Sequence, residues 1–397
     1  MRQRAARGQH LGLIGLILIG LIGTAQAQSP QPPLSDSATA SVVTCGPGNE
    51  FYLAFGHSAI RISDPTRGID HVYNYGTFDF DTPHFYLKFA QGQLNYCLSR
   101  TTFDRFLATY DYERRAVWEQ RLDFSPQEVS NLFLMLEWNY QPENRYYRYD
   151  FFRDNCATRV RDMVESASGK KKIEDCDLQS SMSYRNMVHH STAGGCLQWW
   201  TLGVDLLLGL PADHRVDSRE AMFHPVAMMQ LYANATRDKR PLVSGTRQWL
   251  DDIRPPLRRS FPPLVVFALA LAAVALLSWK HCWPRWADRT LFILAGLVGL
   301  VLCFMWFGTN HWCTRWNPNI LWASPLLILI ALRLEQSPRW ALWLQEGCFA
   351  LAAVWIIACG LSSALLPVVL MLSLRVGMLL KSKNGAPKKP QPQQRRH

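Results

Sequence analysis

The sequence lacks the short motifs that mark the commonest metal and nucleotide sites. No HExxH, CxxC or Walker-A string occurs, and no GxGxxG opens a helix. We therefore predict no metal, no nucleotide and no other cofactor. Charged residues are also scarce, at 18% of 397 residues, whereas hydrophobic residues make up 48%. This balance excludes intrinsic disorder, collagen and a small disulfide-stabilised protein, but it leaves a membrane protein open.

The first 27 residues are typical of a secretory signal peptide. Arginines near the start precede the apolar run LGLIGLILIGLIG, and Ala25-Gln26-Ala27 is an A-x-A cleavage site. The apolar run is shorter than the about 20 residues that a membrane-spanning helix needs. The Pro- and Ser-rich segment 28–43 predicts a flexible leader. Aromatic and charged residues are interleaved over 44–255, which we interpret as an exported, periplasmic domain.

Apolar stretches dominate the chain after Pro262, and they predict an all-α membrane domain over 262–380. We expect about five helices, at 264–279, 290–307, 320–332, 341–358 and 363–380. Lysines and arginines gather after the first and third helices and in the tail 381–397. With the preceding domain exported, all three basic segments lie in the cytoplasm, as the positive-inside rule expects. The net charge of +11 then reflects membrane topology, so we predict no nucleic-acid partner.

Five cysteines fall in the predicted exported domain, and an odd number leaves at least one thiol unpaired in an oxidising compartment. They are Cys45, Cys97, Cys156, Cys176 and Cys196. Two disulfides can form, for example between Cys176 and Cys196, although the sequence does not determine the connectivity. Local context favours Cys156 as the free thiol.

Cys156 is predicted to lie in the first turn of a helix. Apolar residues recur at helical spacing along the segment that it begins, Asp154 or Asn155 can cap the N-terminus, and Gly169 can end the helix. The unpaired amides and the dipole at a helix start favour a thiolate and can lower a thiol pKa from its usual value of about 8.5.

Two arginines, Arg153 and Arg159, add positive charge near this thiol. Together with the helix start they make Cys156 a candidate nucleophile. The alternative is a buried structural cysteine on the helix face.

A thiolate nucleophile usually needs a histidine as its base. The segments 57–62 and 69–75 alternate like two strands joined by the turn DPTRG, which predicts a hairpin. His57 begins the first strand and can act as the base, with His71 or Asn74 on the second strand holding its other ring nitrogen. The alternative for His71 is an exposed strand residue.

Further residues are candidates for substrate binding. The loop 308–319 between the second and third predicted helices would face the exported side, and it is unusually polar. A hydrated turn with interfacial tryptophans is its alternative. The candidates are His311, Asn317 and Asn319 in this loop, together with Asn155 and Tyr75. A dense aromatic stretch either lines an acyl groove or belongs to an ordinary core, and its members are Phe78, Phe80, Phe85, Tyr86 and Phe89.

A histidine on an early strand, followed later by an Asn-Cys at a helix start, resembles the circularly permuted papain-like (NlpC/P60-like) thiol enzymes, which include the lecithin:retinol acyltransferase group. Members of that group handle acyl chains through a Cys thioester. The fold class implied is α+β for the exported domain, followed by the all-α membrane domain.

Longer strings are similar to the Lnb-type bacterial membrane proteins. They are GHSAIRI, VYNYGTFDFDTPHFYLKFAQGQLNY, WNYQPENRYYRYDFFRDNCATRVRD and GVDLLLGLPADHRVDSREAMFHP. That family joins an exported domain to a multi-helix membrane domain and is associated with lipoprotein N-acylation. The resemblance implies Cys156 as the acyl-accepting nucleophile and His57 as its base, and it leaves the third member open between His71 and Asn74.

The function that the resemblance implies is a lipoprotein N-acyltransferase of the bacterial inner membrane. Its acyl donor would be a phospholipid, its acceptors bacterial lipoproteins, and its intermediate a Cys156 thioester. A hydrolase on the same Cys-His pair, such as a phospholipase, a thioesterase or a cell-wall peptidase, is the alternative in which water replaces the amine. A third alternative is a membrane binding module in which Cys156 is structural.

Overall fold

The computed structural model describes residues 34–78, 81–169, 173–174, 182–358, 361 and 363–384. The predicted signal peptide, residues 28–33, Phe80, Cys176 and the tail from residue 385 lie outside the described residues.

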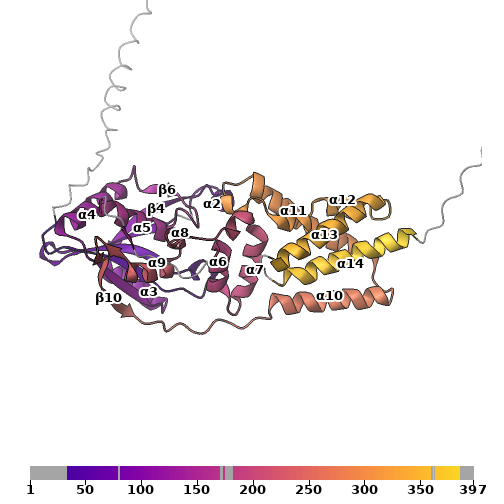
Figure 1. The fold of residues 1–397 in the computed structure, drawn as a ribbon, viewed down its shortest axis with the longest axis horizontal. Coiled ribbons are helices and arrows are strands. Elements are labelled where there is room, and N and C mark those ends of the chain that lie inside the picture. Colours follow the sequence, from indigo (N-terminus) through magenta and orange to yellow (C-terminus); the bar gives the residue numbers. More distant parts are fainter. Residues whose placement is uncertain are drawn as a thin grey trace, which may run out of the picture. The chain divides into compact units, whose positions relative to one another are not determined.

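A seven-stranded antiparallel sheet organises the first part of the chain (Figure 1), in the order β10-β5-β1-β2-β3-β4-β6. Its strands are β1 (Thr39–Cys45), β2 (His57–Asp64), β3 (Ile69–Thr77), β4 (Asn95–Thr102), β5 (Val117–Leu122), β6 (Tyr146–Arg148) and β10 (Val243–Leu250). A small second sheet holds β7 (Ile173–Glu174), β8 (Thr236–Arg237) and β9 (Arg240–Pro241).

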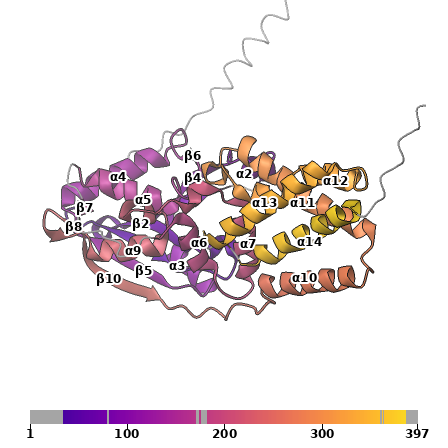
Figure 2. The ribbon, with the colours of Figure 1, turned by 45° about the vertical axis from the view of Figure 1, so that its right-hand side comes forward.

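Helices cover both faces of the large sheet. The helices α4 (Pro126–Tyr140), α5 (Cys156–Ala167) and α9 (Pro225–Asn234) contact its central strands, and α5 lies against β2 and β3. Helix α3 (Phe103–Tyr112) packs with residues of β1, β2 and β3 in a separate buried cluster. The remaining helices of this part are α2 (Phe85–Ala90), α6 (Tyr184–Thr192), α7 (Leu197–Leu207) and α8 (Ser218–Ala221), several of which are visible in Figure 2.

Strand β1 begins at Thr39 and contradicts part of the predicted leader. Its residues from Ala40 to Cys45 are all buried, and the strand pairs with both β2 and β5. Threonine and valine suit a strand that packs on both faces, and the Ser-rich composition of the segment concealed this preference. The leader predicted over 28–43 is therefore wrong from Thr39 onward.

The predicted hairpin and the predicted cysteine helix are both confirmed. Strands β2 and β3 pair in register from Ile60 opposite Tyr73 to Asp64 opposite Ile69, and a single 3-10 turn closes the hairpin. Helix α5 begins at Cys156, and its cap is Asn155. The histidine strand thus precedes the cysteine helix along the chain.

Five helices form the second part of the chain. They are α10 (Pro263–Trp279), α11 (Arg285–Phe307), α12 (Leu326–Leu332), α13 (Arg339–Ala358) and α14 (Leu365–Asn384). Within the described ranges, α11, α13 and residues 365–383 of α14 are long and apolar enough to cross a membrane, while α10 is apolar but has only 17 residues. The fold is α+β followed by an all-α region, as predicted.

The third predicted membrane helix, 320–332, is not continuous. A 3-10 turn covers Pro318–Leu321, and α12 begins only after Pro325. Proline lacks an amide hydrogen and disfavours helical geometry in the residue before it, so it separates the two pieces. The seven residues of α12 are about 10 Å long, too short to span the bilayer alone.

Ion pairs join one end of this helical region. Arg285, at the start of α11, binds Glu335 just beyond α12, and Lys383 in α14 donates to the Glu335 carbonyl at 2.6 Å. Arg375 of α14 makes two hydrogen bonds to Asp288 at 2.7 and 2.9 Å. Asp288 lies in the first turn of α11, which begins directly after Pro284, at Arg285 rather than at the predicted residue 290.

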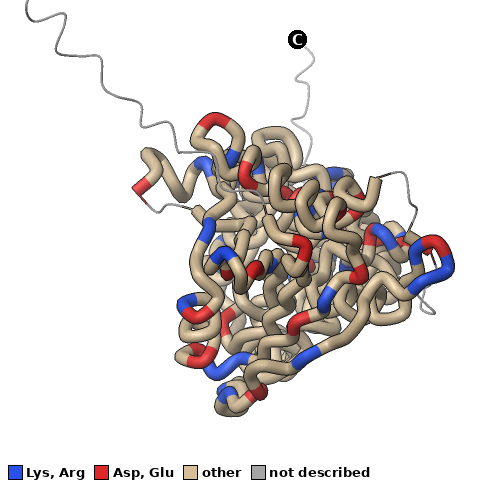
Figure 3. Tube along the Cα trace, turned by 90° about the vertical axis from the view of Figure 1, so that its left-hand side faces the viewer, with Lys and Arg blue, Asp and Glu red and all other residues tan. Residues whose placement is uncertain are grey.

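Basic and acidic residues are interspersed along the chain in the view of Figure 3. Among the exposed pairs, Arg219 binds Asp162 and Glu165 at 2.8 Å each. Charges of mixed sign keep the surface of a domain soluble without attracting one polyelectrolyte.

Candidate active site

Asn155 fixes the start of α5 and with it the position of Cys156. Its Oδ1 accepts hydrogen bonds from the amides of Ala157 and Thr158, both at 2.9 Å. Its Nδ2 donates to the carbonyls of Phe151 and Phe223, both at 2.8 Å. An amide side chain has two acceptor and two donor positions, and all four are used. Asn155 is therefore a buried helix cap, and its position lends no support to the prediction that it binds substrate.

Cys156 lies beside the end of the pairing between β2 and β3. The register of the two strands ends at Ile60 opposite Tyr73, short of His57. The backbone amide of Ser58 donates a hydrogen bond to the Cys156 sulfur, and a Cβ placed on Gly76 of β3 would lie 3.7 Å from the Cys156 Cβ. The first turn of α5 therefore contacts both strands beyond the end of their pairing.

His57 lies between Cys156 and Asn74. Its Nε2 is hydrogen-bonded to Oδ1 of Asn74, and the Cys156 thiol is near enough to the ring for each group to shift the pKa of the other. Because an amide oxygen only accepts, Nε2 carries a proton and Nδ1 is the nitrogen that faces the sulfur. Such a ring can accept the thiol proton at Nδ1 and remain held at Nε2.

A glycine determines where the histidine strand begins. Gly56 has φ +81°, in the left-handed region, and a Cβ there would lie 2.6 Å from the carbonyl oxygen of Cys45. Any other residue at this position would be strained and would clash with backbone atoms of β1. Gly56 thus lets the chain turn directly into β2 at His57.

The electrostatics of the pair favour a thiolate and an imidazolium. Burial by itself raises the pKa of Cys156, but the charge and hydrogen bond of His57 and the amides of Ser58 and Ala157 outweigh it, so the pKa lies below its ordinary value. Burial by itself lowers the pKa of His57, but the Cys156 thiolate and the Asn74 hydrogen bond outweigh it and raise the pKa. Each partner stabilises the charged form of the other.

A neighbouring thiol shows the opposite behaviour. Cys45 is fully buried, and burial raises its pKa well above the ordinary value despite a hydrogen bond with Tyr110. Among the described residues, the thiols of Cys45, Cys156 and Cys196 are free. The suggested Cys176–Cys196 disulfide involves Cys176, which lies outside the described residues. The prediction that Cys156 stays free is confirmed.

The two arginines predicted to activate Cys156 have other partners. Arg159 binds Asp154 through both carboxylate oxygens and lies 4.0 Å from the centre of the Tyr147 ring. Arg153 lies 3.6 Å from the centre of the Trp312 ring. The positive charge that stabilises the thiolate is that of His57.

His71 is not the partner of His57. It lies three residues before Asn74 on β3, and successive side chains of a strand alternate between faces. Its ring packs edge-on to Tyr73 at 6.4 Å, and burial and the charge of Arg100 lower its pKa. Of the two residues that the sequence left open, the structure places Asn74 beside His57, and the prediction for His71 is wrong.

Two family models match the chain and together cover both of its parts. The Lnb N-terminal periplasmic domain matches residues 34–190, and the Lnb transmembrane domain matches residues 256–384. The chain belongs to the Lnb family. No curated protein and no solved structure matches it. Membership indicates an inner-membrane protein with a periplasmic N-terminal domain, and an enzyme that modifies lipoproteins at the membrane.

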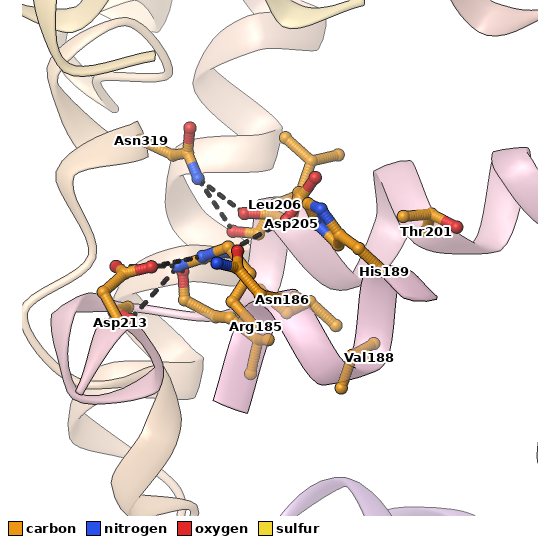
Figure 4. A network of polar contacts seen from close by, with 12 residues as sticks. Arg185, Asn186, Val188, His189, Thr201, Asp205, Leu206, Asp213 and Asn319 are labelled. Carbon is orange, nitrogen blue, oxygen red and sulfur yellow. Dashed lines mark hydrogen bonds and ion pairs between the residues drawn. The ribbon is translucent and has the colours of Figure 1, made fainter. Parts of the chain in front are cut away.

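Two residues of the Lnb transmembrane domain hold a helix of the preceding part. Asn317 donates to the carbonyls of Leu206 and Leu207, at 2.7 and 3.1 Å. Asn319 donates to the carbonyl of Asp205 at 2.8 Å and to that of Leu206 at 3.4 Å (Figure 4). Both side chains are buried and bind the last carbonyls of α7, which lack partners within the helix. These contacts lend no support to the prediction that Asn317 and Asn319 bind substrate.

A buried ionic network lies beside this contact. Arg185 of α6 binds Asp213 at 2.7 Å and Asp205 at 3.0 Å, and His189 binds the same Asp205 oxygen at 2.7 Å (Figure 4). Arg185 also donates to the carbonyls of Leu208 and Gly209. The network holds the end of α7 in the geometry that Asn317 and Asn319 bind.

The other two predicted substrate residues are also structural. Tyr75 is buried, and its hydroxyl donates to Oδ1 of Asn139 at 2.6 Å, so it belongs to the core under α4. His311 donates from Nε2 to the carbonyl of Phe89 at 3.3 Å. It contacts α2 rather than Cys156, and the prediction that either residue binds substrate finds no support in its position.

Tyr149 is a further residue whose electrostatics are coupled to the thiol. Burial and the charge of the Cys156 thiolate raise the pKa of Tyr149. Its ring stacks on Tyr96 with 4.3 Å between ring centres. The only signal was the aromatic run RYYRYDFF that precedes the Asn-Cys pair. Within the described residues, no group of three or more His, Cys, Asp or Glu is placed to hold a metal ion.

Proposed function

We propose that this Lnb-family protein is a lipoprotein N-acyltransferase that carries the acyl chain on Cys156. One observation carries the proposal: Asn74 holds His57 by a hydrogen bond, and His57 in turn lowers the pKa of the Cys156 thiol. Nucleophile, base and orienting residue in this order are the parts that a thiol acyltransferase requires.

The first step is acylation of the thiol. The Cys156 thiolate attacks the ester carbonyl of a phospholipid, so that a C–S bond forms and the ester C–O bond breaks. The leaving alkoxide takes the Nδ1 proton of the His57 imidazolium and departs as a lysophospholipid. The products are an acyl-Cys156 thioester and a neutral imidazole.

The second step transfers the acyl chain to an amine. The α-amine of a lipoprotein's lipidated N-terminal cysteine attacks the thioester, a C–N bond forms and the C–S bond breaks. Nδ1 of His57 takes the proton that the amine releases, which restores the thiolate–imidazolium pair. A thioester reacts readily with amines, so the reaction needs no activated donor.

The helix start provides a donor for the oxyanion. The Asn155 side chain accepts hydrogen bonds from the amides of Ala157 and Thr158 but not from the amide of Cys156. The backbone N–H of Cys156 then stabilises the negative charge that develops on the carbonyl oxygen in both steps.

The membrane part places the site near its substrates, since both donor and acceptor are embedded in the bilayer. The basic tail lies in the cytoplasm, and the chain crosses the membrane five times, with the broken segment 318–332 as the third crossing. The contacts of Glu335 with Arg285 and Lys383 support this, because they place the end of α12 beside the start of α11 and the end of α14.

The test is the mass of a lipoprotein N-terminus in cells that depend on this protein. Wild-type protein and the Cys196→Ala variant should give N-acylated lipoprotein, and Cys156→Ala should give none while still fractionating with the membrane. Unchanged N-acylation with Cys156→Ala would refute the proposal. Steady release of free fatty acid from phospholipid without any amine acceptor would identify a hydrolase instead.

A further inference from the structure

Helix α2 exposes apolar side chains to its surroundings. Tyr86 is 80% exposed, Phe89 56% and Leu87 53%, and no residue of the helix is fully buried. These aromatic residues are therefore not an ordinary core. Three large apolar side chains on one short helix are costly in water and indicate a surface that another apolar phase covers.

The contacts of α2 determine its level relative to the bilayer. The amide of Asn310 donates to the carbonyl of Gln91 at 2.9 Å, and His311 donates to that of Phe89 at 3.3 Å. Asn310 and His311 come just after α11, which ends at Phe307. Helix α11 is long and apolar enough to cross a membrane. Helix α2 thus lies at the level where α11 emerges from the hydrocarbon core of the bilayer.

Exposed aromatic residues mark the same level on the neighbouring loop. Phe307 is 76% exposed and Trp316 63%. The ring of Trp306 stacks on Phe307 at 5.0 Å and contacts Trp316 at 5.1 Å. Tryptophan gathers at the membrane–water interface because its ring is apolar and its N–H is polar.

A row of aromatic rings leads from α2 to the thiol. Phe85 of α2 lies 5.8 Å from Phe78, and Phe78 lies 5.2 Å from Tyr96, between ring centres. Tyr96 stacks on Tyr149 at 4.3 Å. Phe78 follows two residues after Gly76 of β3, where a Cβ would lie 3.7 Å from the Cys156 Cβ, so the row reaches the thiol at this end of β3. The faces of these phenylalanine and tyrosine rings are apolar, as a path for an acyl chain requires.

We infer that α2 inserts Tyr86, Leu87 and Phe89 into the periplasmic leaflet and that a phospholipid acyl chain leaves the bilayer there, along the aromatic row, to reach Cys156. The occupant of this surface is a phospholipid bilayer. The path of the acyl chain to Cys156 rests on the proposed function. The contact of α2 with lipid does not depend on catalysis.

Photo-crosslinking tests the lipid contact. A photoreactive benzophenone amino acid at Leu87 of the full-length protein in phosphatidylethanolamine–phosphatidylglycerol vesicles should cross-link to phospholipid. The matched control is the same amino acid at Leu134 of α4, which is 63% exposed but belongs to a helix that packs on the sheet. Equal cross-linking at both positions, or none at Leu87, would overturn the inference.

Acylation rates test the path. Leu87→Ser with Phe89→Ser should slow acyl-adduct formation on Cys156 from vesicle phospholipid about tenfold or more, because two apolar anchors are lost. The rate with a water-soluble short-chain aryl ester should not change. Leu134→Ser with Trp138→Ser is the control pair and should alter neither rate.

The outcomes separate the two ideas. Equal loss with both donors shows a damaged site and overturns the path, and an unchanged vesicle rate overturns it as well. If the protein with benzophenone at position 87 cross-links to phospholipid but wild-type protein forms no adduct with either donor, the proposed function is contradicted while the lipid contact stands.

Discussion

The amide oxygen of Asn74 accepts a hydrogen bond from Nε2 of His57, and this contact determines which ring nitrogen meets the sulfur. Without it, the ring can carry its proton on either nitrogen and can rotate away from Cys156. The pair therefore explains why a short polar residue on β3 accompanies the histidine on β2.

Replacing Asn74 should impair the base without removing it. The Asn74 hydrogen bond raises the pKa of His57, so Asn74→Ala should lower that pKa and weaken the thiolate–imidazolium pair. We expect the rate of Cys156 acylation to fall about tenfold or more at neutral pH. The measurement is adduct formation over time by intact mass.

His71→Ala is the control for this change, since His71 lies on the same strand but on the other face. Its acylation rate should stay within about twofold of wild type, as expected for a side chain away from the site. If His71→Ala lost as much activity as Asn74→Ala, the assignment of Asn74 would be contradicted.

The thiol should react at unusually low pH. Because the pKa of Cys156 is lowered, its thiolate is present below the ordinary thiol pKa, and alkylation by iodoacetamide should already proceed there. His57→Ala removes the charge that lowers the pKa, so the alkylation profile should move to higher pH.

Cys45 supplies the internal comparison, since burial raises its pKa and it should stay unmodified over the same pH range. Peptide mass spectrometry reads both sites in one experiment. A Cys156 profile that does not move in His57→Ala would contradict the ion pair.

Activity should depend on pH in a bell shape. Acylation needs the thiolate and the imidazolium together, so the rate should rise as pH passes the lowered Cys156 pKa and fall as pH passes the raised His57 pKa. In Asn74→Ala the falling limb should move to lower pH, because the lost hydrogen bond no longer raises the His57 pKa. A falling limb that stays in place would show that Asn74 does not act through His57.

Asn319 should matter for stability rather than for chemistry. Asn319→Ala leaves the buried carbonyl of Asp205 without its donor, and an unsatisfied buried group costs about 1–3 kcal/mol. The thermal midpoint in detergent should fall, while the alkylation profile of Cys156 should not shift. The control is Asn234→Ala, which removes an exposed side chain that donates to the carbonyl of Gln230 at the end of α9. This change should alter neither the thermal midpoint nor the alkylation profile.

The buried Arg185 should contribute more to the free energy of unfolding than the exposed Arg219. Arg185→Met leaves Asp205 and Asp213 without their main cation and should destabilise the protein by about 3–5 kcal/mol. Arg219→Met removes exposed pairs and should cost about 1 kcal/mol or less. Urea unfolding followed by tryptophan fluorescence compares them, and equal losses would contradict the burial argument.

Local patterns predicted the elements that carry Cys156 and His57. The spacing after Cys156, the capping residue Asn155 and the alternation on both sides of the turn DPTRG are short-range signals, and each acts within a few residues. The strand that begins at His57 and the helix that begins at Cys156 follow from them. Their proximity does not, because it depends on how α5 packs against a sheet of distant strands.

The sequence did not reveal that several polar side chains bind backbone groups. Asn155, Asn317 and Asn319 read as ligand-binding amides, yet each binds carbonyls or amides at a helix end. The tertiary packing of the chain determines which helix end lies beside a given asparagine. The choice between His71 and Asn74, by contrast, was within reach, since strand alternation places them on opposite faces once the hairpin register is known.

The most direct test of the account is the intact mass of the purified protein after exposure to phospholipid vesicles without an amine acceptor. We predict a mass increase of one acyl chain, located on Cys156, removed by hydroxylamine and absent from Cys156→Ala. No acyl adduct, or an adduct that persists in Cys156→Ala, would contradict it.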